Sequence, residues 1–157
     1  SDVCSSDLWD EDMISVVAGC RVGYVCMHAG GKPKEMQKNP RYRDVVAEVA
    51  GFLSGRLASL AATGVERTRV LLDVGIGFGK TAEHNRALLE ADWSELERPL
   101  LWGLSRKSFL ETTKAEKKMK DRDEALDAWN RHLLGRHQPM VWRVHDPLRI
   151  RRSWESR

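Results

Sequence analysis

The segment Asp73-Val-Gly-Ile-Gly-Phe-Gly-Lys80-Thr81 places an acid, three glycines, a lysine and a hydroxyl directly after an apolar run. Closely spaced glycines allow a tight turn whose backbone can approach a ligand. The phosphate-binding P-loop, G-x-x-x-x-G-K-[ST], would need its first glycine at the position of Val74. The spacing therefore excludes a P-loop. It predicts a ligand-binding turn or, as the alternative, a glycine turn that only joins a strand to a helix.

Ser105, Arg106 and Lys107 follow the next apolar run along the chain. A hydroxyl beside two cations suits an anionic ligand such as a carboxylate or a phosphate. Charges that are simply solvated are the alternative.

Arg143 and His145 lie two residues apart near the end of a further apolar run, so strand alternation directs both to the same side. An arginine among apolar neighbours is costly to bury without a partner. A bound anion would supply that partner, and so would the nearby Asp146.

Met27 and His28 end the first apolar run. A lone histidine in such a place is more often a core residue than a ligand or a base. The lysine-rich stretch 33–40 that follows predicts an exposed loop.

Four apolar runs, rich in residues that suit buried strands, occupy positions 22–27, 69–73, 99–103 and 140–145. Helical periodicity lies between them. The clearest stripe of apolar residues spans 45–60 and predicts a helix. Gly64 follows it, and glycine is typical of the position just after a helix end.

A second helix is predicted over 82–96, and a third starts at Asp121, with Glu124 completing a capping box, and ends near Gly135. A short helix over 11–17 precedes the first strand.

Strands that alternate with helical crossovers build parallel sheets. Four such units predict either half of a (β/α)₈ barrel or a small doubly wound sheet, and the strand pattern does not separate the two. In both architectures ligands bind at the carboxyl ends of the strands, where the polar groups described above are found.

With 157 residues the chain is long enough for one domain with a core. The net charge of +3 gathers near the end of the chain, which predicts a basic, solvated tail over 149–157 and argues against nucleic-acid binding. The sequence contains no run of about eighteen apolar residues, so no membrane span is expected. Cys4, Cys20 and Cys26 lack the spacing of a zinc site or a disulfide framework, so a reducing, cytoplasmic location is expected.

The first eight residues, SDVCSSDL, show no periodicity and resemble the translation of adapter DNA. They are set apart as a non-native segment, and residues 9–148 are taken as a partial barrel domain.

Four segments, in order, resemble motifs of the dihydropteroate synthases. They are CMHAGGKPKEMQKNPRYRDVVAEV, DVGIGFGKTAEHN, PLLWGLSRKSFL and WRVHDP. The resemblance covers roughly residues 13–146. It implies that the chain is the C-terminal half of a (β/α)₈ TIM barrel. It also implies an activity in folate biosynthesis, the condensation of 7,8-dihydropterin-6-ylmethyl diphosphate with 4-aminobenzoate to give 7,8-dihydropteroate and diphosphate.

The resemblance implies roles for residues at the pterin end of the site. Asp73 would hold the pterin amino group and ring nitrogens through paired, charge-assisted hydrogen bonds. Lys107 would bind the pterin and carry positive charge near the reacting centre, and Met27 and Gly103 would pack against the ring.

At the other end, the resemblance implies that Ser105 binds the carboxylate of 4-aminobenzoate, with Phe78 and Arg106 lining its pocket. Arg143 and His145 would grip the departing diphosphate. Together with Lys107 they form the expected catalytic set. No metal ligand is expected in this chain, because the family holds Mg²⁺ mainly through the diphosphate and an Asn-x-Thr motif in its first half.

Two departures from the family pattern are visible. Val74 replaces a proline, which predicts a less rigid turn. The segment 111–136 is unusually charged and carries Trp129, which places the family's homodimer contact in doubt.

The family's first four strands are also absent, so the 157 residues are expected to be inactive alone. The alternatives to a synthase are the pterin-binding domain of a folate- or corrinoid-dependent methyltransferase and a diverged, inactive paralogue.

Overall fold

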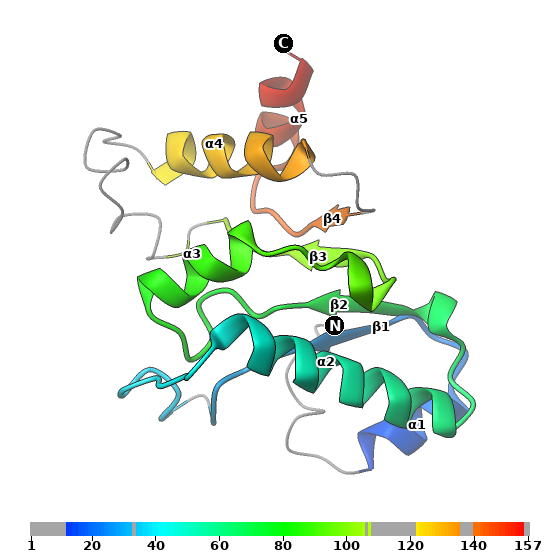
Figure 1. Ribbon diagram of the computed structural model, residues 1–157. Helices are drawn as coiled ribbons and strands as arrows, with labels where there is room; N and C mark the ends of the chain where they lie inside the picture. Colours follow the sequence, from blue (N-terminus) through cyan, green and yellow to red (C-terminus); the bar gives the residue numbers. More distant parts are fainter. Residues whose placement is uncertain (1–11, 33, 106, 108–121, 136–139, 156–157) are drawn as a thin grey trace.

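The protein contains one four-stranded parallel sheet in the order β1-β2-β3-β4 (Figure 1). The computed structural model describes residues 12–32, 34–105, 107, 122–135 and 140–155. The strands are β1 (Tyr24–Met27), β2 (Val70–Asp73), β3 (Leu100–Trp102) and β4 (Met140–Trp142). Each lies within one of the four predicted runs, but all four are shorter than predicted. The fourth run was expected to extend to residue 145, yet β4 ends at Trp142, so Arg143 and His145 lie just beyond the strand.

Helices connect the strands in the predicted alternation. They are α1 (Met13–Gly19), α2 (Val45–Ala62), α3 (Ala82–Glu90), α4 (Arg122–Leu134) and α5 (Pro147–Glu155), with short 3₁₀ turns η1 (Arg67–Arg69) and η2 (Ser94–Leu96). The start predicted for α4 at Asp121 falls outside the described residues.

The helix α2 begins where Asp44 accepts hydrogen bonds from the backbone N–H groups of Val46 and Ala47. Its apolar stripe is buried against the sheet, with Leu53 fully inaccessible. Gly64 follows the helix with φ of +82°, a conformation that favours glycine. Among the described residues, α2 is the one helix with the length and apolar character of a membrane span, but its buried stripe is that of a core helix.

The helix α3 is shorter than the predicted helix over 82–96, because the chain turns away after Glu90. The Asp92 carboxylate accepts the backbone N–H of Ser94 at 2.9 Å, a local bond that competes with helical hydrogen bonding. Trp93 is buried and donates its indole N–H to the Leu88 carbonyl, so the turn is held against the end of α3.

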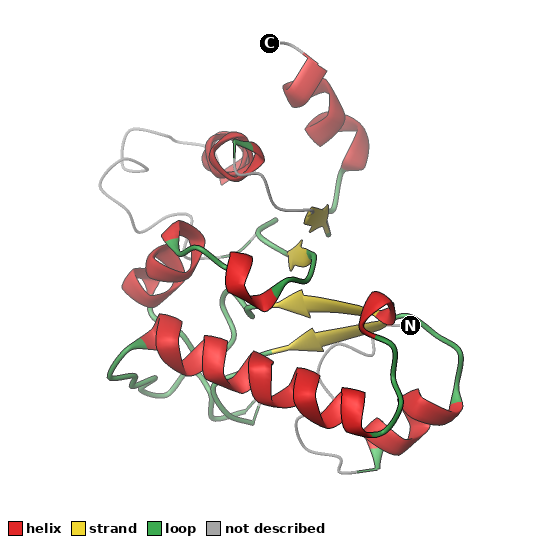
Figure 2. Ribbon diagram, turned by 45° about the vertical axis from the view of Figure 1, so that its right-hand side comes forward, coloured by secondary structure: helices red, strands yellow, loops and turns green. Residues whose placement is uncertain are grey.

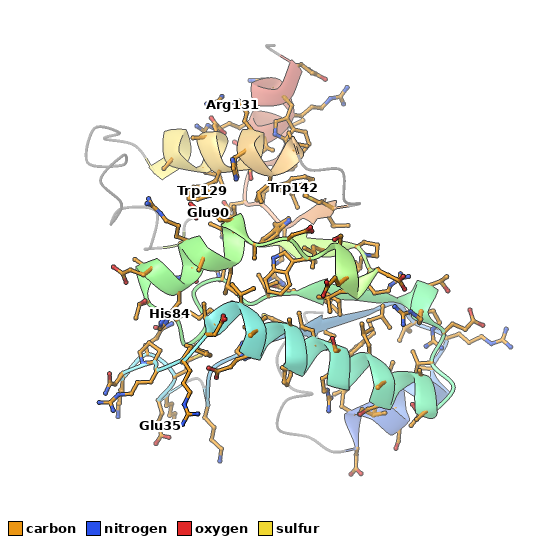
Figure 3. The ribbon with its side chains drawn as sticks, in the orientation of Figure 1. Glu35, His84, Glu90, Trp129, Arg131 and Trp142 are labelled. Carbon is orange, nitrogen blue, oxygen red and sulfur yellow. The ribbon has the colours of Figure 1, made fainter. Side chains whose placement is uncertain are left out.

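Most of the segment 149–157, predicted as a basic, solvated tail, is helical, because α5 extends to Glu155. Ile150 is buried, and the Trp154 ring meets Trp142 edge to face at 5.1 Å. Arg149 pairs with Asp127 of α4 at 3.1 Å. Figure 3 shows Trp129 of α4 and Trp142 of β4 in the layer between that helix and the sheet. Ile150 and Trp154 are four positions apart and lie on the same face of α5, so this helix is amphipathic.

The helices cover one face of the sheet, and α2, α3 and α4 follow one another around it (Figure 2). Alternate strand residues such as Cys26, Leu72 and Trp102 enter this core. A doubly wound sheet would carry helices on both faces and would reverse its strand order at a switch point. Sequential order with one helical face is the arrangement of a barrel segment, and it resolves the choice that the strand pattern left open.

Candidate active site

The side chains expected to bind ligands meet at the carboxyl ends of the strands, on the face opposite the helical core. Met27 and Asp73 are register partners on β1 and β2. Gly103 and Arg143 directly follow the register partners Trp102 and Trp142 of β3 and β4. Because strand residues alternate in direction, these four share the face that the helices leave uncovered.

Asp73 is buried, and both of its carboxylate oxygens are engaged. Oδ1 accepts the backbone N–H of Gly75 at 2.7 Å, and Oδ2 lies 3.4 Å from Nη2 of Arg143. Burial raises the pKa of Asp73 above its ordinary value, while the Gly75 N–H and the cations of Arg143, Lys107 and Lys80 act to lower it. The carboxylate is therefore the negative centre of a mainly positive site.

Arg143 lies over Gly103. A Cβ atom added at Gly103 would stand 3.1 Å from Nη2 of Arg143, so the glycine leaves the space that the guanidinium occupies. The backbone N–H of Arg143 donates to the Trp102 carbonyl at 2.9 Å and fixes the residue to the end of β3. The Arg143 side chain remains 37% exposed, so part of it is accessible from solvent.

Lys107 reaches across to the glycine-rich turn after β2. Its ammonium donates to the Ile76 carbonyl at 2.8 Å and lies 3.9 Å from the centre of the Phe78 ring, a cation–π contact. Burial and then the charge of Arg143 lower the pKa of Lys107 to about 8, although Asp73 acts in the opposite direction.

Ser105 and His145 also come together, although 40 residues separate them. The Ser105 hydroxyl lies 2.9 Å from Nδ1 of His145 and also accepts the His145 backbone N–H at 3.4 Å. The structure therefore joins the ends of β3 and β4 through two of the expected site residues. Arg106 lies outside the described residues.

Two buried polar residues near the site were not predicted to have a role in it, Lys80 and Asn85. Asn85 accepts the backbone N–H of Gly77 at 2.8 Å and donates to the Thr81 carbonyl at 2.8 Å. Lys80 is only 4% exposed and bonds to His28, which was interpreted as a core residue and is indeed buried. The sequence signal was present, because Gly-Lys-Thr leads directly into the α3 N-cap at Thr81. A lysine after a glycine turn, however, usually faces solvent.

Val74, the departure from the family's proline, is 1% exposed and belongs to the apolar core. The valine side chain is therefore packed into the core at the start of the turn.

The described part of the chain contains no cluster of three histidine, cysteine or acidic side chains that could hold a metal ion. Cations instead surround the buried Asp73 carboxylate. Such an arrangement can accept hydrogen bonds from a paired N–H edge at Asp73 and can attract an anion at Arg143 and Lys107.

A family profile described as "Pterin binding enzyme" matches residues 2–145. The dihydropteroate synthase of Neisseria meningitidis serogroup B is 39% identical over 143 residues, which cover 87% of this chain and 50% of that protein. The corresponding enzyme of Escherichia coli K12 is 44% identical over 89 residues, which cover 55% of this chain and 32% of that protein. The chain therefore spans half or less of the length of these curated relatives.

Solved dihydropteroate synthases share the fold. The Thermus thermophilus enzyme in complex with 4-aminobenzoate matches with a TM-score of 0.79 and 35% identity, over 95% of this chain and 60% of that one. The Xanthomonas albilineans enzyme in complex with 7,8-dihydropteroate matches with a TM-score of 0.75 and 30% identity, over 95% of this chain and 55% of that one. The prediction of a partial (β/α)₈ barrel is confirmed.

Proposed function

The chain belongs to the pterin binding enzyme family, and on that basis we propose that it supplies the second half of a dihydropteroate synthase barrel. The observation that supports this most directly is the buried Asp73 carboxylate, ringed by Arg143, Lys107 and Lys80 at the ends of parallel strands. The active protein would condense 7,8-dihydropterin-6-ylmethyl diphosphate with 4-aminobenzoate.

In this reaction the amine nitrogen of 4-aminobenzoate attacks the methylene carbon next to the pterin ring. A C–N bond forms, the C–O bond to the diphosphate breaks, and the nitrogen loses a proton. The leaving group takes the electron pair of the broken bond, so negative charge grows on its oxygen. Cations that already face this oxygen stabilise the transition state more than the ground state.

Asp73 would receive the pterin. The 2-amino group and the adjacent ring N–H form a donor pair that matches the two oxygens of a carboxylate. Oδ1 already accepts the Gly75 N–H, which fixes the carboxylate plane, so Oδ2 would have to exchange Arg143 for the pterin. Lys107, whose charge acts on Asp73, would add a donor to the ring, and Met27 and Gly103 would provide its apolar contact.

Arg143 and His145 would receive the diphosphate. If Arg143 released Asp73, its partly exposed guanidinium could bind two phosphate oxygens. Ser105, bonded to His145, would hold the carboxylate of 4-aminobenzoate, with Phe78 and Arg106 forming the wall of that pocket. The Ser105–His145 contact would then join a residue proposed for 4-aminobenzoate to one proposed for the diphosphate.

The described residues do not fit a magnesium ion, since they offer cations where Mg²⁺ prefers oxygen anions. We therefore assign any Mg²⁺ to the diphosphate itself and to protein groups outside this chain. The small-molecule substrates are the proposed partners. The cytoplasmic location and the homodimer of the complete protein are still predictions from the sequence. The segment that bears on the dimer, 111–136, lies partly outside the described residues.

The function is tested by joining residues 9–157 to the first half of the Neisseria meningitidis relative. Incorporation of radiolabelled 4-aminobenzoate into dihydropteroate is then measured, with Asp73→Asn as the matched inactive control. The isolated chain should form no product. Pterin binding without incorporation would indicate a methyltransferase-type binding domain. A soluble, folded protein that neither binds nor reacts would indicate an inactive paralogue.

A further inference from the structure

Lys80 is the lysine of the glycine-rich segment, and the roles proposed above do not use it. Its ammonium donates to three acceptors, the Gly75 carbonyl at 3.0 Å, the Phe78 carbonyl at 3.1 Å and Nδ1 of His28 at 2.9 Å. The side chain is 4% exposed. An ammonium has three donors, and all three are occupied here. Lys80 therefore has no donor left for a substrate and can affect the reaction only through its neighbours.

The three acceptors belong to two different loops. Gly75 and Phe78 lie in the turn after β2, and His28 follows β1. The two loops touch so closely that a side chain on Gly75 would overlap the His28 carbonyl, and a Cβ on Gly79 would lie 2.8 Å from the Cα of Gly30. Backbone bonds join them as well, from His28 N–H to the Asp73 carbonyl at 3.0 Å and from Gly30 N–H to the Phe78 carbonyl at 3.2 Å.

This turn carries the residues that face the ligands. Gly75 donates its N–H to Asp73, and Ile76 and Phe78 hold Lys107 by a hydrogen bond and by the aromatic ring. By binding the carbonyls of both Gly75 and Phe78, Lys80 spans the turn from inside and fixes the positions of Asp73 and Lys107 together.

We propose that Lys80 is a positioning residue, which locks the turn after β2 onto His28 and keeps the Asp73 carboxylate in its pterin-binding form. The inference rests on the proposed function only in taking the ligand of Asp73 to be a pterin. His28 suits the acceptor role, because burial and the neighbouring lysine lower its pKa to about 4, which leaves the ring neutral at pH 7. In the tautomer that carries the proton on Nε2, Nδ1 accepts from the ammonium at 2.9 Å.

The charge of Lys80 also acts on Asp73, whose pKa it lowers against the effect of burial. Burial lowers the pKa of Lys80 itself to about 7, while Asp73 raises it and Lys107 lowers it. The charged groups that set this balance are thus Asp73 and Lys107, with Arg143 acting on Asp73 from just beyond β4. His28 faces Lys80 as a hydrogen-bond partner. Removal of the Lys80 charge should move the protonation of Asp73 to higher pH.

Two variants separate charge from shape. Lys80→Met removes the charge and the three hydrogen bonds. Lys80→Arg keeps a charge, but the donors of its planar guanidinium are spread over three nitrogens and cannot replace three hydrogen bonds from one ammonium nitrogen. Lys80→Gln replaces Lys80→Met if the latter does not fold. Lys38→Met, at an exposed lysine of the loop after β1, is the matched control.

The experiment uses the joined two-half protein, with calorimetric binding of 6-hydroxymethylpterin from pH 4 to 9 and a ¹³C carboxyl titration of Asp73. For Lys80→Met we expect the dissociation constant at pH 7 to rise about tenfold. We also expect the Asp73 titration midpoint, and the acidic limit of pterin binding, to move to higher pH. Lys80→Arg should weaken binding while leaving the midpoint close to that of the unaltered protein.

Pterin affinity and an Asp73 midpoint that both stay unchanged in Lys80→Met would overturn the proposal. If the unaltered protein binds no pterin, the proposed function fails, and the Asp73 titration alone then decides the role of Lys80. A shifted midpoint would uphold that role, and an unshifted midpoint would refute it.

Discussion

Arg143 pairs with Asp73 across the inner face of the sheet, with 3.4 Å between Nη2 and Oδ2. The pair forms although β2 and β4 are not neighbours in the sheet. The arginine directly follows β4 and the aspartate ends β2, so the guanidinium reaches over Gly103, which directly follows the intervening strand β3. The pair links two groups to which we assign different substrates. Asp73 is the group proposed for the pterin, and Arg143 is the group proposed for the diphosphate.

Asp73→Asn should abolish tight pterin binding while the protein remains folded. Asparagine keeps an oxygen that can accept the Gly75 N–H but loses the charge that strengthens bonds to the pterin. A loss of about 2 kcal/mol would raise the dissociation constant roughly thirtyfold. Calorimetric titration with a pterin measures this, and affinity equal to that of the unaltered protein would remove Asp73 from the site.

Gly103→Ala should disturb the position of Arg143. The new methyl group would stand 3.1 Å from Nη2, so the guanidinium must shift from its place over β3. We expect the KM for the pterin diphosphate to rise about fivefold, with little change in the free energy of unfolding.

Gly55→Ala is the matched control for that substitution, because a Cβ at Gly55, inside α2, meets no atom within 4 Å. It should raise the free energy of unfolding by roughly 0.5–1 kcal/mol and leave the KM unchanged. Equal KM values for the two alanine variants would contradict the proposed place of Arg143.

Substrate affinity should fall in alkaline solution as Lys107 loses its proton. Its pKa is lowered to about 8, so its positive charge is present below that pH and disappears as the pH rises through it. The KM for the pterin diphosphate should therefore increase between pH 7 and 9. Arginine stays protonated throughout this range, so Lys107→Arg should lose this part of the pH dependence. Parallel profiles for the two proteins would show that another group is responsible.

Acid should destabilise the fold through His28. Its pKa is lowered to about 4 in the folded state, while the unfolded chain takes up the same proton near the ordinary histidine value of 6.5. The unfolded state thus binds more protons between these values, and stability falls as the pH drops from about 6.5 to 4, by up to roughly 3 kcal/mol. His28→Gln, which can still accept from Lys80, should flatten this decline in urea unfolding. Superimposable stability curves would exclude His28.

The strands and the strand-end polar groups could be predicted from the sequence, because buried strands are short apolar runs and ligand groups follow them. The strand pattern alone could not choose a barrel segment over a doubly wound sheet, since the face on which a crossover helix packs depends on contacts between distant elements. The resemblance of four segments to the dihydropteroate synthases did predict the barrel. The end of α3 was missed because the side chain of Asp92 interrupts an otherwise helical pattern.

Within the site, Asp73, Arg143 and Lys107 were predicted and the structure brings them together. The role of Lys80 was missed, because its burial depends on the packing of two loops against each other. Gly30 in one loop and Gly75 in the other are 45 residues apart in the sequence. His145 was expected on the strand with Arg143 and is held by Ser105 instead.

The strand order β1-β2-β3-β4 has a consequence for synthesis of the chain on the ribosome. Each strand pairs with the one made just before it, so every new βα unit finds its partner already outside the exit tunnel. No described strand has to wait for a distant later segment, and the loop closed at each step is short. The described sheet can therefore grow in the order of translation, from β1 to β4.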